Sequence, residues 1–505
     1  MHSLQYEEYI LGADIGTTGC KTVILDTGGK IIGSESEYYQ TSRPKPDWAE
    51  QNPEDWYRAF KKTVKHVLIK HGVRGNEIVS VGIDGMMNSP TFINRFGKLL
   101  RSSIIWMDQR SIPQARSIKE KIYEGRSQPV SAVPMLTKIL WVKENQPKIW
   151  NRTYKVLSPK DYVRFRLTGS LVSDVSDASA TSLFDAKKLN WSSEICEALD
   201  IDVDKLPEVV PSVKIVGHIS SKASKETGIA EGTPVVAGCS DGAADCLTAG
   251  VAEPPDCLIR LGTTGALFMV IDRFTPDPSL RYFVVGHCIS NRWLAHQIFP
   301  FGLPHSWFHY TFYEQEMRNA SKKGEDPYSA IEEKAERISP GSDGLIFHPY
   351  LMSDASTHMR GGFFGIALQH KREHFARAVL EGIAFSLKES FAPFFEIDPS
   401  IKSVKLIGGG SKSRLVRQIV CNVLGVRGLV PLFQDASLGA AMLGGIGSNV
   451  FRDHREAVER CVKIRDITRP SSAIQRKYGR LFAAFAKLCQ DMAKNYELLS
   501  NILEK

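Results

Sequence analysis

The N-terminal part of the chain alternates between short apolar, β-branched runs and glycine-rich turns. This pattern predicts three strands, at residues 9–14, 22–26 and 31–39, joined into an antiparallel meander. A helix is expected next, over residues 53–71, because apolar residues recur there at intervals of three and four positions. Asn52 is a favourable N-cap for this helix, and Gly72 can end it.

The rest of the chain continues the alternation of strands and helices. Buried strands are predicted at 78–83, 233–238 and 404–407, and an Asp- and Ser-rich loop is predicted at 174–181. Amphipathic helices are expected at 372–390, from the glycine-rich segment 408–413 to about 424, and from 472 to the end. Strands interleaved with helices in this way are typical of an α/β fold.

One pattern occurs twice. Residues 15–26 read IGTTGCKTVILD and residues 261–272 read LGTTGALFMVID, so that five positions match at an offset of 246. The matched residues are Gly16, Thr17, Thr18, Gly19 and Asp26 in the first copy, and Gly262, Thr263, Thr264, Gly265 and Asp272 in the second. A Gly- and Thr-rich turn between two strands presents backbone N–H groups and hydroxyls, which suit phosphate. We interpret the copies as phosphate-binding hairpins; two ordinary glycine-rich turns are the alternative.

The spacing of the repeat, about half the chain, predicts two similar α/β domains with a central cleft between them. A chain of 505 residues also exceeds what one core usually supports. The segment Ala-Glu-Pro-Pro-Asp at 252–256 is the clearest boundary, which gives domains at 1–251 and 252–505.

Composition and charge narrow the classes of function. The chain carries 64 Lys and Arg against 56 Asp and Glu, a net charge of +8 spread along the sequence. This suits a small anionic ligand but not nucleic acid. No apolar run approaches the roughly 18 residues of a membrane span, and the N-terminus lacks a signal-peptide pattern. Nine cysteines without a CxxC motif indicate reduced thiols, so a cytoplasmic protein is expected.

The two copies of the repeat differ in their charged residues. Asp14 of the first copy corresponds to Arg260 of the second, and Lys21 corresponds to Leu267. A carboxylate at a strand end beside a phosphate-type turn suits Mg²⁺ or its water ligands, and Lys21 adds positive charge for phosphate. A P-loop is rejected, because Cys20 interrupts the Gly-Lys-Ser/Thr signature and β-type residues follow it.

Asp241 is the strongest candidate for catalysis. It follows the predicted strand 233–238, in a loop of small residues where a helix begins. A carboxylate in this place can accept a proton from a substrate hydroxyl while the helix N-terminus helps to bind anions. For Asp241 taken alone, a helix cap is the alternative. Further polar groups that can bind hydroxyls fall in loops after strands of the first domain: Asp84, Asn88, Asp108 and Arg110.

Nine segments, in order along nearly the whole chain, resemble the motifs of the FGGY carbohydrate kinases, and the most similar branch is xylulokinase-like. They are residues 9–19, 48–56, 106–110, 237–242, 261–265, 360–365, 378–385, 408–413 and 436–441. The resemblance implies an actin-like, ribonuclease H-like fold duplicated into two lobes. It also implies Mg²⁺ and ATP in the cleft, with a sugar deeper and mostly on the first lobe and the nucleotide on the second.

The resemblance also implies roles for individual residues. Asp241 matches the catalytic base, which also contacts the substrate, and Asp14 matches the acidic residue near the metal and the phosphates. Phosphate contacts are implied for Thr17, Thr18, Gly262 and Thr263, and contacts with the rest of the nucleotide for Gly302, Gly409, Gly410 and Ser413. Sugar contacts are implied for Met87, Asn88 and Asp108.

Two departures from the family pattern affect the substrate. Asn88 stands where a xylulokinase typically has His, and Gly242 follows Asp241 without the amide side chain often found there. We therefore predict an ATP-dependent kinase that phosphorylates a ketopentose such as xylulose, with a gluconate or polyol kinase as the alternative. A non-catalytic ATP-binding regulator is a third hypothesis, but a regulator needs neither Asp14 nor Asp241. The oligomeric state is left open, with a homodimer as one candidate.

Overall fold

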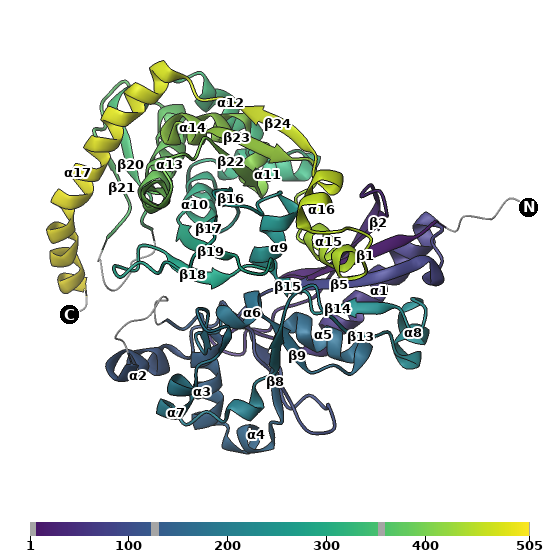
Figure 1. The fold of residues 1–505 in the computed structure, drawn as a ribbon. Helices are drawn as coiled ribbons and strands as arrows, with labels where there is room; N and C mark the ends of the chain where they lie inside the picture. The colour runs from purple at the N-terminus through teal and green to yellow at the C-terminus, as the bar shows by residue number, and fades with distance from the viewer. Residues whose placement is uncertain (1–6, 123–130, 352–358, 504–505) are drawn as a thin grey trace, which may run out of the picture. The chain divides into compact units, whose positions relative to one another are not determined.

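The N-terminal meander forms as predicted in the computed structural model of the chain, which describes residues 7–122, 131–351 and 359–503 (Figure 1). Strand β1 (Tyr9–Ile15) pairs antiparallel with β2 (Gly19–Asp26), and β2 pairs antiparallel with β3 (Ile31–Tyr38). All residues of β1 are buried, which explains why its sequence is a continuous apolar run interrupted only by Asp14.

Helix α1 (Pro53–His71) has the predicted bounds and the predicted caps. The side chain of Asn52 accepts a hydrogen bond from the Glu54 N–H at 3.1 Å. Gly72 ends the helix in the left-handed conformation, with φ of 67°, which a glycine adopts without strain. The buried face of α1, which includes Trp56 and Phe60, packs against β2 and β3 and forms part of the core on that side of the meander.

The meander belongs to a larger mixed sheet with the strand order β13-β14-β5-β1-β2-β3, in which β15 also pairs with β5. The added strands are β5 (Ile78–Gly85), β13 (Ile215–His218), β14 (Pro234–Val236) and β15 (Cys239–Ser240). Strand β5 runs parallel to β1, and β14 and β15 run parallel to β5. The carboxyl ends of β1, β5 and β15 therefore lie at the same edge of the sheet.

The loop predicted at 174–181 is wrong in its central part, which forms the short helix α6 (Val175–Ser179). Asp174 caps this helix by accepting a hydrogen bond from the Ser176 N–H at 2.9 Å. The polar composition has a structural cause, because α5 (Pro159–Thr168) buries Lys160 against this segment. The Lys160 ammonium lies 2.6 Å from the Asp161 carboxylate and 3.0 Å from that of Asp174. Buried carboxylates that pair with buried cations resemble a solvated loop in sequence.

The chain divides into two compact units. Unit 1 consists of Met1–Pro254, Val270–Ala295 and Phe433–Lys463, and unit 2 of Pro255–Met269, His296–Leu432 and Ile464–Lys505. The first division lies near the boundary predicted after residue 251, and the chain then returns twice to unit 1.

A second sheet has the strand order β18-β19-β17-β16-β22-β23-β24. Its strands are β16 (Cys257–Leu261), β17 (Gly265–Ile271), β18 (Phe283–Gly286), β19 (Trp293–Phe299), β22 (Ser403–Ile407), β23 (Arg427–Pro431) and β24 (Ile464–Thr468). β16 and β17 form an antiparallel hairpin, and β22 runs parallel to β16. β16 thus lies between β17 and β22 as β1 lies between β2 and β5. The repeat seen in the sequence is a repeat in topology.

Helices of unit 2 follow the predicted pattern with one change of length. Helix α13 (Arg372–Ile397) continues past the predicted end at residue 390 and contains Pro393, because buried Phe391 and Phe394 hold its last turns in the core. The others are α10 (Gly302–Phe312), α11 (Glu314–Lys323), α12 (Ser329–Glu336), α14 (Arg414–Leu424) and α17 (Ser472–Leu503). None of the helices in the described ranges has the length and apolar character needed to cross a membrane.

The remaining elements are short, and most belong to unit 1. Its other helices are α2 (Ile112–Ile122), α3 (Met135–Asn145), α4 (Pro147–Arg152), α7 (Ser193–Ala198), α8 (Ser221–Thr227), α9 (Asp241–Thr248), α15 (Ser437–Gly447) and α16 (His454–Cys461). Paired short strands are β4 (Glu50–Gln51) with β7 (Ser103–Ile104), β6 (Thr91–Ile93) with β8 (Lys155–Leu157), β9 (Val172–Asp174) with β12 (Glu208–Val210), β10 (Phe184–Asp185) with β11 (Asn190–Trp191), and, in unit 2, β20 (Ile346–His348) with β21 (Gly362–Phe364).

Candidate functional site

Glycines allow helix α15 to lie directly on the backbones of β1 and β5. A Cβ atom at Gly12 would lie 2.0 Å from the carbonyl oxygen of Ser437, and one at Gly82 would lie 1.9 Å from that of Ala440. Gly439 of α15 approaches α9 in the same way, since a Cβ there would lie 2.4 Å from a carbonyl oxygen of that helix. Small residues therefore seat α15 on β1 and β5 and bring α9 against α15.

Four carboxylates gather at this end of the first sheet. Asp14 lies near the end of β1, and Asp84 of β5 is its partner in the parallel register. Asp241 is the first residue of α9, and Asp435 lies just before α15. Electrostatic interactions couple Asp14 and Asp84 to each other and to the other two. The structure thus brings the two predicted catalytic residues, Asp14 and Asp241, into one cluster in unit 1.

Lys21 provides a fixed positive charge beside this cluster. It is the partner of Asp14 in the β1–β2 ladder, and its ammonium lies 2.6 Å from Oδ2 of Asp435. The other oxygen of Asp435 accepts a hydrogen bond from the Ser437 hydroxyl at 2.7 Å. Partial burial lowers the pKa of Lys21, but the Asp435 carboxylate outweighs this and raises it. Lys21 is therefore a cation at neutral pH, held at the first glycine-rich turn.

Asp14 and Asp84 are buried carboxyl groups with unfilled hydrogen-bonding capacity. Burial raises the pKa of both well above the usual range; next in size come the Asp435 charge for Asp14 and the Asp14 charge for Asp84. When the carboxyls are ionised, Oδ1 of Asp14 and both carboxylate oxygens of Asp84 have no hydrogen-bond donor among the described residues. Buried carboxylates in this condition require a proton or a cation.

The residues present fit a magnesium ion. Mg²⁺ is usually bound by one or two carboxylates and completes its octahedron with water and substrate phosphates. Within the part of the chain that the structure describes, no group of three or more His, Cys, Asp and Glu side chains is arranged to hold a metal. Asp14 has an oxygen without a hydrogen-bond donor among the described residues and lies beside a phosphate-type turn. It therefore suits a magnesium ion that is bound mainly by water and phosphate oxygens, and not one bound by protein ligands alone.

Asp241 is not the capping residue of its helix. Ser240 occupies the N-cap, and its hydroxyl accepts a hydrogen bond from the Ala243 N–H at 3.4 Å. The N–H of Ser240 donates to the Ser176 hydroxyl at 2.9 Å, which fixes the loop before the helix. Oδ1 of Asp241 accepts from the Gly242 N–H at 2.8 Å. The alternative of a simple cap therefore applies to Ser240, and the partly exposed Asp241 carboxylate lies at the positive end of α9.

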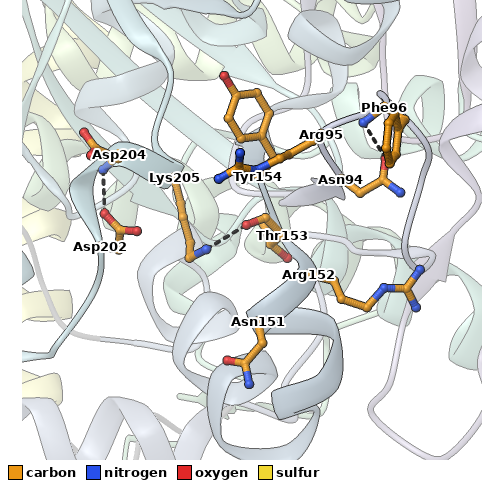
Figure 2. A pocket seen from close by; sticks show the side chains of 10 residues that line it. All are labelled: Asn94, Arg95, Phe96, Asn151, Arg152, Thr153, Tyr154, Asp202, Asp204 and Lys205. Carbon is orange, nitrogen blue, oxygen red and sulfur yellow. Dashed lines mark hydrogen bonds between the residues drawn. The ribbon is translucent and has the colours of Figure 1, made fainter.

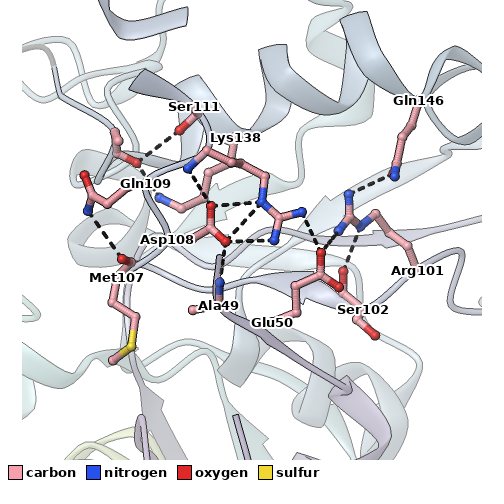
Figure 3. A network of polar contacts seen from close by, with 12 residues as sticks. Ala49, Glu50, Arg101, Ser102, Met107, Asp108, Gln109, Ser111, Lys138 and Gln146 are labelled. Atoms are coloured by element: carbon pink, nitrogen blue, oxygen red, sulfur yellow. Dashed lines mark hydrogen bonds and ion pairs between the residues drawn. The ribbon is translucent and has the colours of Figure 1, made fainter. Parts of the chain in front are cut away.

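Asp108, a predicted sugar contact, is fully buried in a network of ion pairs. Nη2 of Arg110 lies 2.7 Å from its Oδ2, and the Ala49 N–H donates to the same oxygen at 2.5 Å. Arg110 stacks on the ring of Trp48 and also pairs with Glu50 at 2.6 Å. Figure 3 shows this network, with Asp108 beside Ala49 and Glu50 near a further arginine. The contacts hold the loop that follows β7.

Asn88 and Thr17 are fixed by contacts with neighbouring loops. Asn88 adopts the left-handed conformation, with φ of 61°, and its Oδ1 accepts a hydrogen bond from the Met135 N–H at 3.2 Å. The amide is thereby oriented, and Met87 before it is half-buried. The Trp106 indole N–H donates to the Thr17 hydroxyl at 2.9 Å. The first glycine-rich turn is therefore tied to the segment that carries the predicted sugar contacts, while Thr18 at its tip is exposed.

In unit 2, the predicted nucleotide residues gather at the carboxyl ends of the parallel strands β16 and β22. A Cβ at Gly302 would lie 2.6 Å from the Gly262 carbonyl oxygen and from Cα of Thr263, so the start of α10 rests on the second glycine-rich turn. A Cβ at Gly410 would lie 2.3 Å from the ring of Phe301. The approach at Gly302 is to backbone atoms and requires glycine, whereas a side chain at Gly410 would require the Phe301 ring to shift.

Gly409 and Ser413 complete this group. Gly409 is exposed, and among the described residues no atom beyond its chain neighbours lies within 4 Å of where its Cβ would be. Ser413 caps α14, since its hydroxyl accepts a hydrogen bond from the Val416 N–H at 3.2 Å. Burial raises the pKa of Glu332 of α12 to about 7, although an interaction with Ser413 opposes this rise. The open backbone at Gly409 therefore lies next to a capped helix and a buried carboxyl group.

A polar hollow of about 590 Å³ lies elsewhere in unit 1 (Figure 2). It is lined by Asn94, Arg95, Phe96, Asn151, Arg152, Thr153, Tyr154, Asp202, Asp204 and Lys205. The lining groups bond to one another, as in the Lys205 ammonium that donates to the Thr153 carbonyl at 2.7 Å. None of the predicted site residues lines this hollow, and we assign it no ligand.

One residue of the cluster was expected in a different element, and another was not predicted. Asp84 was expected in a loop, but β5 extends to Gly85 and places it inside the sheet. Asp435 was not predicted, although it directly precedes the segment 436–441. An aspartate before a helix of small residues is the signal that pointed to it.

Comparisons with known proteins extend over both units. Sequence models of the N-terminal and C-terminal domains of the FGGY family of carbohydrate kinases match residues 9–248 and 257–448. A xylulose kinase from Bacillus subtilis (strain 168) is 30% identical over 95% of this chain and 96% of its own length. A gluconokinase from the same organism is 30% identical over 98% of both chains.

Among solved structures, a gluconate kinase from Lactobacillus acidophilus superposes with a TM-score of 0.89 at 26% identity. The superposition covers 98% of this chain and 100% of the other. The actin-like α/β fold of two domains expected from the sequence is confirmed.

Proposed function

Because the chain belongs to the FGGY family of carbohydrate kinases, we propose that it transfers the γ-phosphoryl group of ATP to a hydroxyl of a ketopentose such as xylulose. One observation carries this proposal above all. The Asp241 carboxylate, at the start of α9, lies in the same charge cluster as Asp14, beside the first Gly-Thr-Thr-Gly turn. A base for the hydroxyl and a carboxylate for the cation are thus present together, as phosphoryl transfer requires.

Asp241 acts as the general base. Its bond from the Gly242 N–H fixes the carboxylate, and the positive end of α9 favours the ionised form that accepts a proton. The terminal hydroxyl of the sugar would lose its proton to Asp241 as its oxygen bonds to the γ-phosphorus, while the bond from that phosphorus to the β,γ-bridging oxygen breaks and ADP leaves. Positioning and charge stabilisation supply most of the acceleration in reactions of this type.

Each glycine-rich turn, taken by itself, is suited to phosphate. In unit 1 the contacts come from backbone N–H groups and hydroxyls of Thr17 and Thr18, with Lys21 as a fixed cation. In unit 2 they come from Gly262 and Thr263. Asp14 would hold Mg²⁺, directly or through its waters. When bound, Mg²⁺ neutralises phosphate charge.

The rest of the nucleotide and the sugar use the other predicted residues. Nucleotide contacts come from Gly302, Gly409, Gly410 and Ser413, where the approach of backbone to backbone and the open space at Gly409 support this assignment. Sugar contacts come from Met87 and Asn88. Asp108, the third residue expected to contact the sugar, is fully buried and paired with Arg110, so its role here is to hold the loop that follows β7.

A gluconate or polyol kinase is the second candidate. It is favoured by Asn88, whose neutral amide is oriented by Met135 where an imidazole is typical of xylulokinases. The gluconokinase similarity is also as high as the xylulose kinase similarity, at 30% identity each. A buried polar pocket discriminates strongly between hydroxyl patterns, so one changed contact is sufficient to change the substrate.

The test is a coupled assay of ADP release with ketopentoses, aldonates and polyols as acceptors, followed by mass spectrometry of the product. We expect the highest kcat/KM with a ketopentose and a single phosphate on its terminal hydroxyl. A higher kcat/KM with gluconate or a polyol would establish the second candidate. ADP release that no carbohydrate raises above the ATP-only rate would refute catalysis.

A further inference from the structure

Asp84 is an unusual occupant of the interior of a strand. Its side chain has no exposed surface, and it follows the apolar Ile83 within β5. Neither of its carboxylate oxygens has a hydrogen-bond donor among the described residues. Burial of an ionised carboxylate is strongly unfavourable unless a cation or several donors compensate it. The position therefore calls for a partner of positive charge.

The register of the sheet directs Asp84 toward Asp14. The two residues are paired across the parallel strands β5 and β1, and side chains at paired positions project from the same face of a sheet. Their carboxyl groups lie within hydrogen-bonding reach of each other. Asp84 has no exposed surface and Asp14 is 8% exposed, so the pair has little contact with solvent.

The lysine that interacts with Asp14 is already engaged. Lys21 is the ladder partner of Asp14, but its ammonium lies 2.6 Å from the carboxylate of Asp435. The strongest charge interactions of Asp84 are with three other carboxylates: Asp14, Asp435 and Asp241. The orphaned oxygens of the pair, one from Asp14 and two from Asp84, are thus left for a cation that does not come from a side chain.

We infer that Asp84 is a second carboxylate of the cation site, which with Asp14 holds the divalent metal that accompanies the nucleotide. This inference rests on the proposed phosphoryl transfer and extends it to one further residue. Hard divalent cations prefer carboxylate oxygens, and affinity rises with the number of charged ligands. Water and phosphate oxygens would complete the coordination of the metal. A site with only two protein carboxylates agrees with the finding that no group of three or more His, Cys, Asp and Glu side chains in the described residues is arranged to hold a metal.

If Asp84 is instead a neutral hydrogen-bond donor, its substitution by asparagine should leave the metal affinity unchanged. A neutral Asp84 would donate a hydrogen bond to Asp14 and bind no metal. Asparagine reproduces this role, because its amide donates a hydrogen bond from nearly the same position. The substitution Asp84→Asn therefore keeps a hydrogen-bond donor but removes a metal ligand. The two roles are separated by a measurement of metal affinity.

The experiment is calorimetric titration of the full-length protein with ADP, in Mn²⁺ and in excess EDTA. The ratio of the two dissociation constants measures how much the metal strengthens nucleotide binding. We expect Asp84→Asn to reduce this ratio about tenfold or more, and Asp14→Asn to reduce it at least as much. Asp26→Asn is the matched control, since it removes the same charge at the opposite end of the β1–β2 ladder, where Asp26 faces Tyr9. We expect it to leave the ratio unchanged.

Folding is checked by thermal unfolding in EDTA, where Asp84→Asn should melt at the wild-type temperature or above because it removes a buried charge. If it melts lower than Asp26→Asn, the smaller Asp84→Ser is titrated in its place. An unchanged ratio in the folded variant, or a wild-type ratio of one, would overturn the inference. The proposed function fails separately, if wild-type protein phosphorylates no carbohydrate.

Discussion

Gly82 is the position at which a single methyl group should disturb both the fold and the site. It lies in β5 two residues before Asp84, and α15 rests on it. In Gly82→Ala the new Cβ would lie 1.9 Å from the carbonyl oxygen of Ala440 and 2.7 Å from its carbonyl carbon. Both contacts are with backbone atoms and are shorter than 3.0 Å, a distance below which Cβ atoms are essentially never found. Helix α15 therefore has to move by about 1 Å.

Such overpacking typically lowers the free energy of unfolding by about 1–3 kcal/mol. We expect a loss near the upper end of this range, because the clash is between the backbone of a helix and a central strand. The same movement carries Asp435, which lies just before α15, away from Lys21. We therefore expect a loss of about 2–3 kcal/mol in stability together with a severalfold higher KM for ATP.

The assay combines urea unfolding with steady-state kinetics of ADP release. Gly479→Ala is the matched control, because in the described part of the chain no atom outside the local turn of α17 lies within 4 Å of the new Cβ. Alanine also favours a helix over glycine by about 1 kcal/mol. The control should be as stable as wild type or more so. If Gly82→Ala unfolds at the wild-type urea concentration, the direct seating of α15 on β5 is wrong.

Three other substitutions address the hairpins and a buried acid. Asp435→Asn should raise KM for ATP severalfold while the melting temperature hardly changes, because a half-exposed ion pair adds little stability but holds Lys21; an unchanged KM would count against that role. Gly302→Ala places a Cβ 2.6 Å from the Gly262 carbonyl oxygen and should raise KM for ATP about tenfold with KM for the sugar constant, whereas an equal rise in both would contradict a local effect on the second turn. Burial raises the pKa of Asp177 to about 7, whereas a free carboxyl group titrates near pH 4. Between about pH 4 and pH 7 the native state therefore binds one more proton than the unfolded state, and it loses stability as the pH rises through this range. Asp177→Asn should remove a slope on the order of 1 kcal/mol per pH unit from urea unfolding between pH 5 and 7, and identical slopes in both proteins would refute this.

Local patterns in the sequence were sufficient for the elements that frame the site. Helix α1 formed with the predicted bounds, because its periodicity, its Asn52 cap and its Gly72 stop are all local signals. The two hairpins were predicted for a similar reason, since a glycine-rich turn between β-branched runs leaves few other conformations.

Contacts between distant segments were the part that sequence could not supply. The pairing of Asp84 with Asp14 depends on the parallel register of β5 and β1, which no local pattern encodes. The ion pair of Asp435 with Lys21 depends on α15 being seated on the sheet, more than four hundred residues along the chain from Lys21. The segment of α6 was predicted as a loop because its aspartates look solvent-exposed in the sequence. In the structure these aspartates pair with buried cations of another helix, such as Lys160.

We propose that Asp241 removes the proton from the sugar hydroxyl. The most direct measurement compares wild type with Asp241→Asn in the coupled ADP-release assay, using the best acceptor, and measures ATP binding by calorimetry in parallel. We expect kcat to fall at least about 100-fold with the ATP dissociation constant unchanged. Turnover by Asp241→Asn within a few fold of wild type would contradict it.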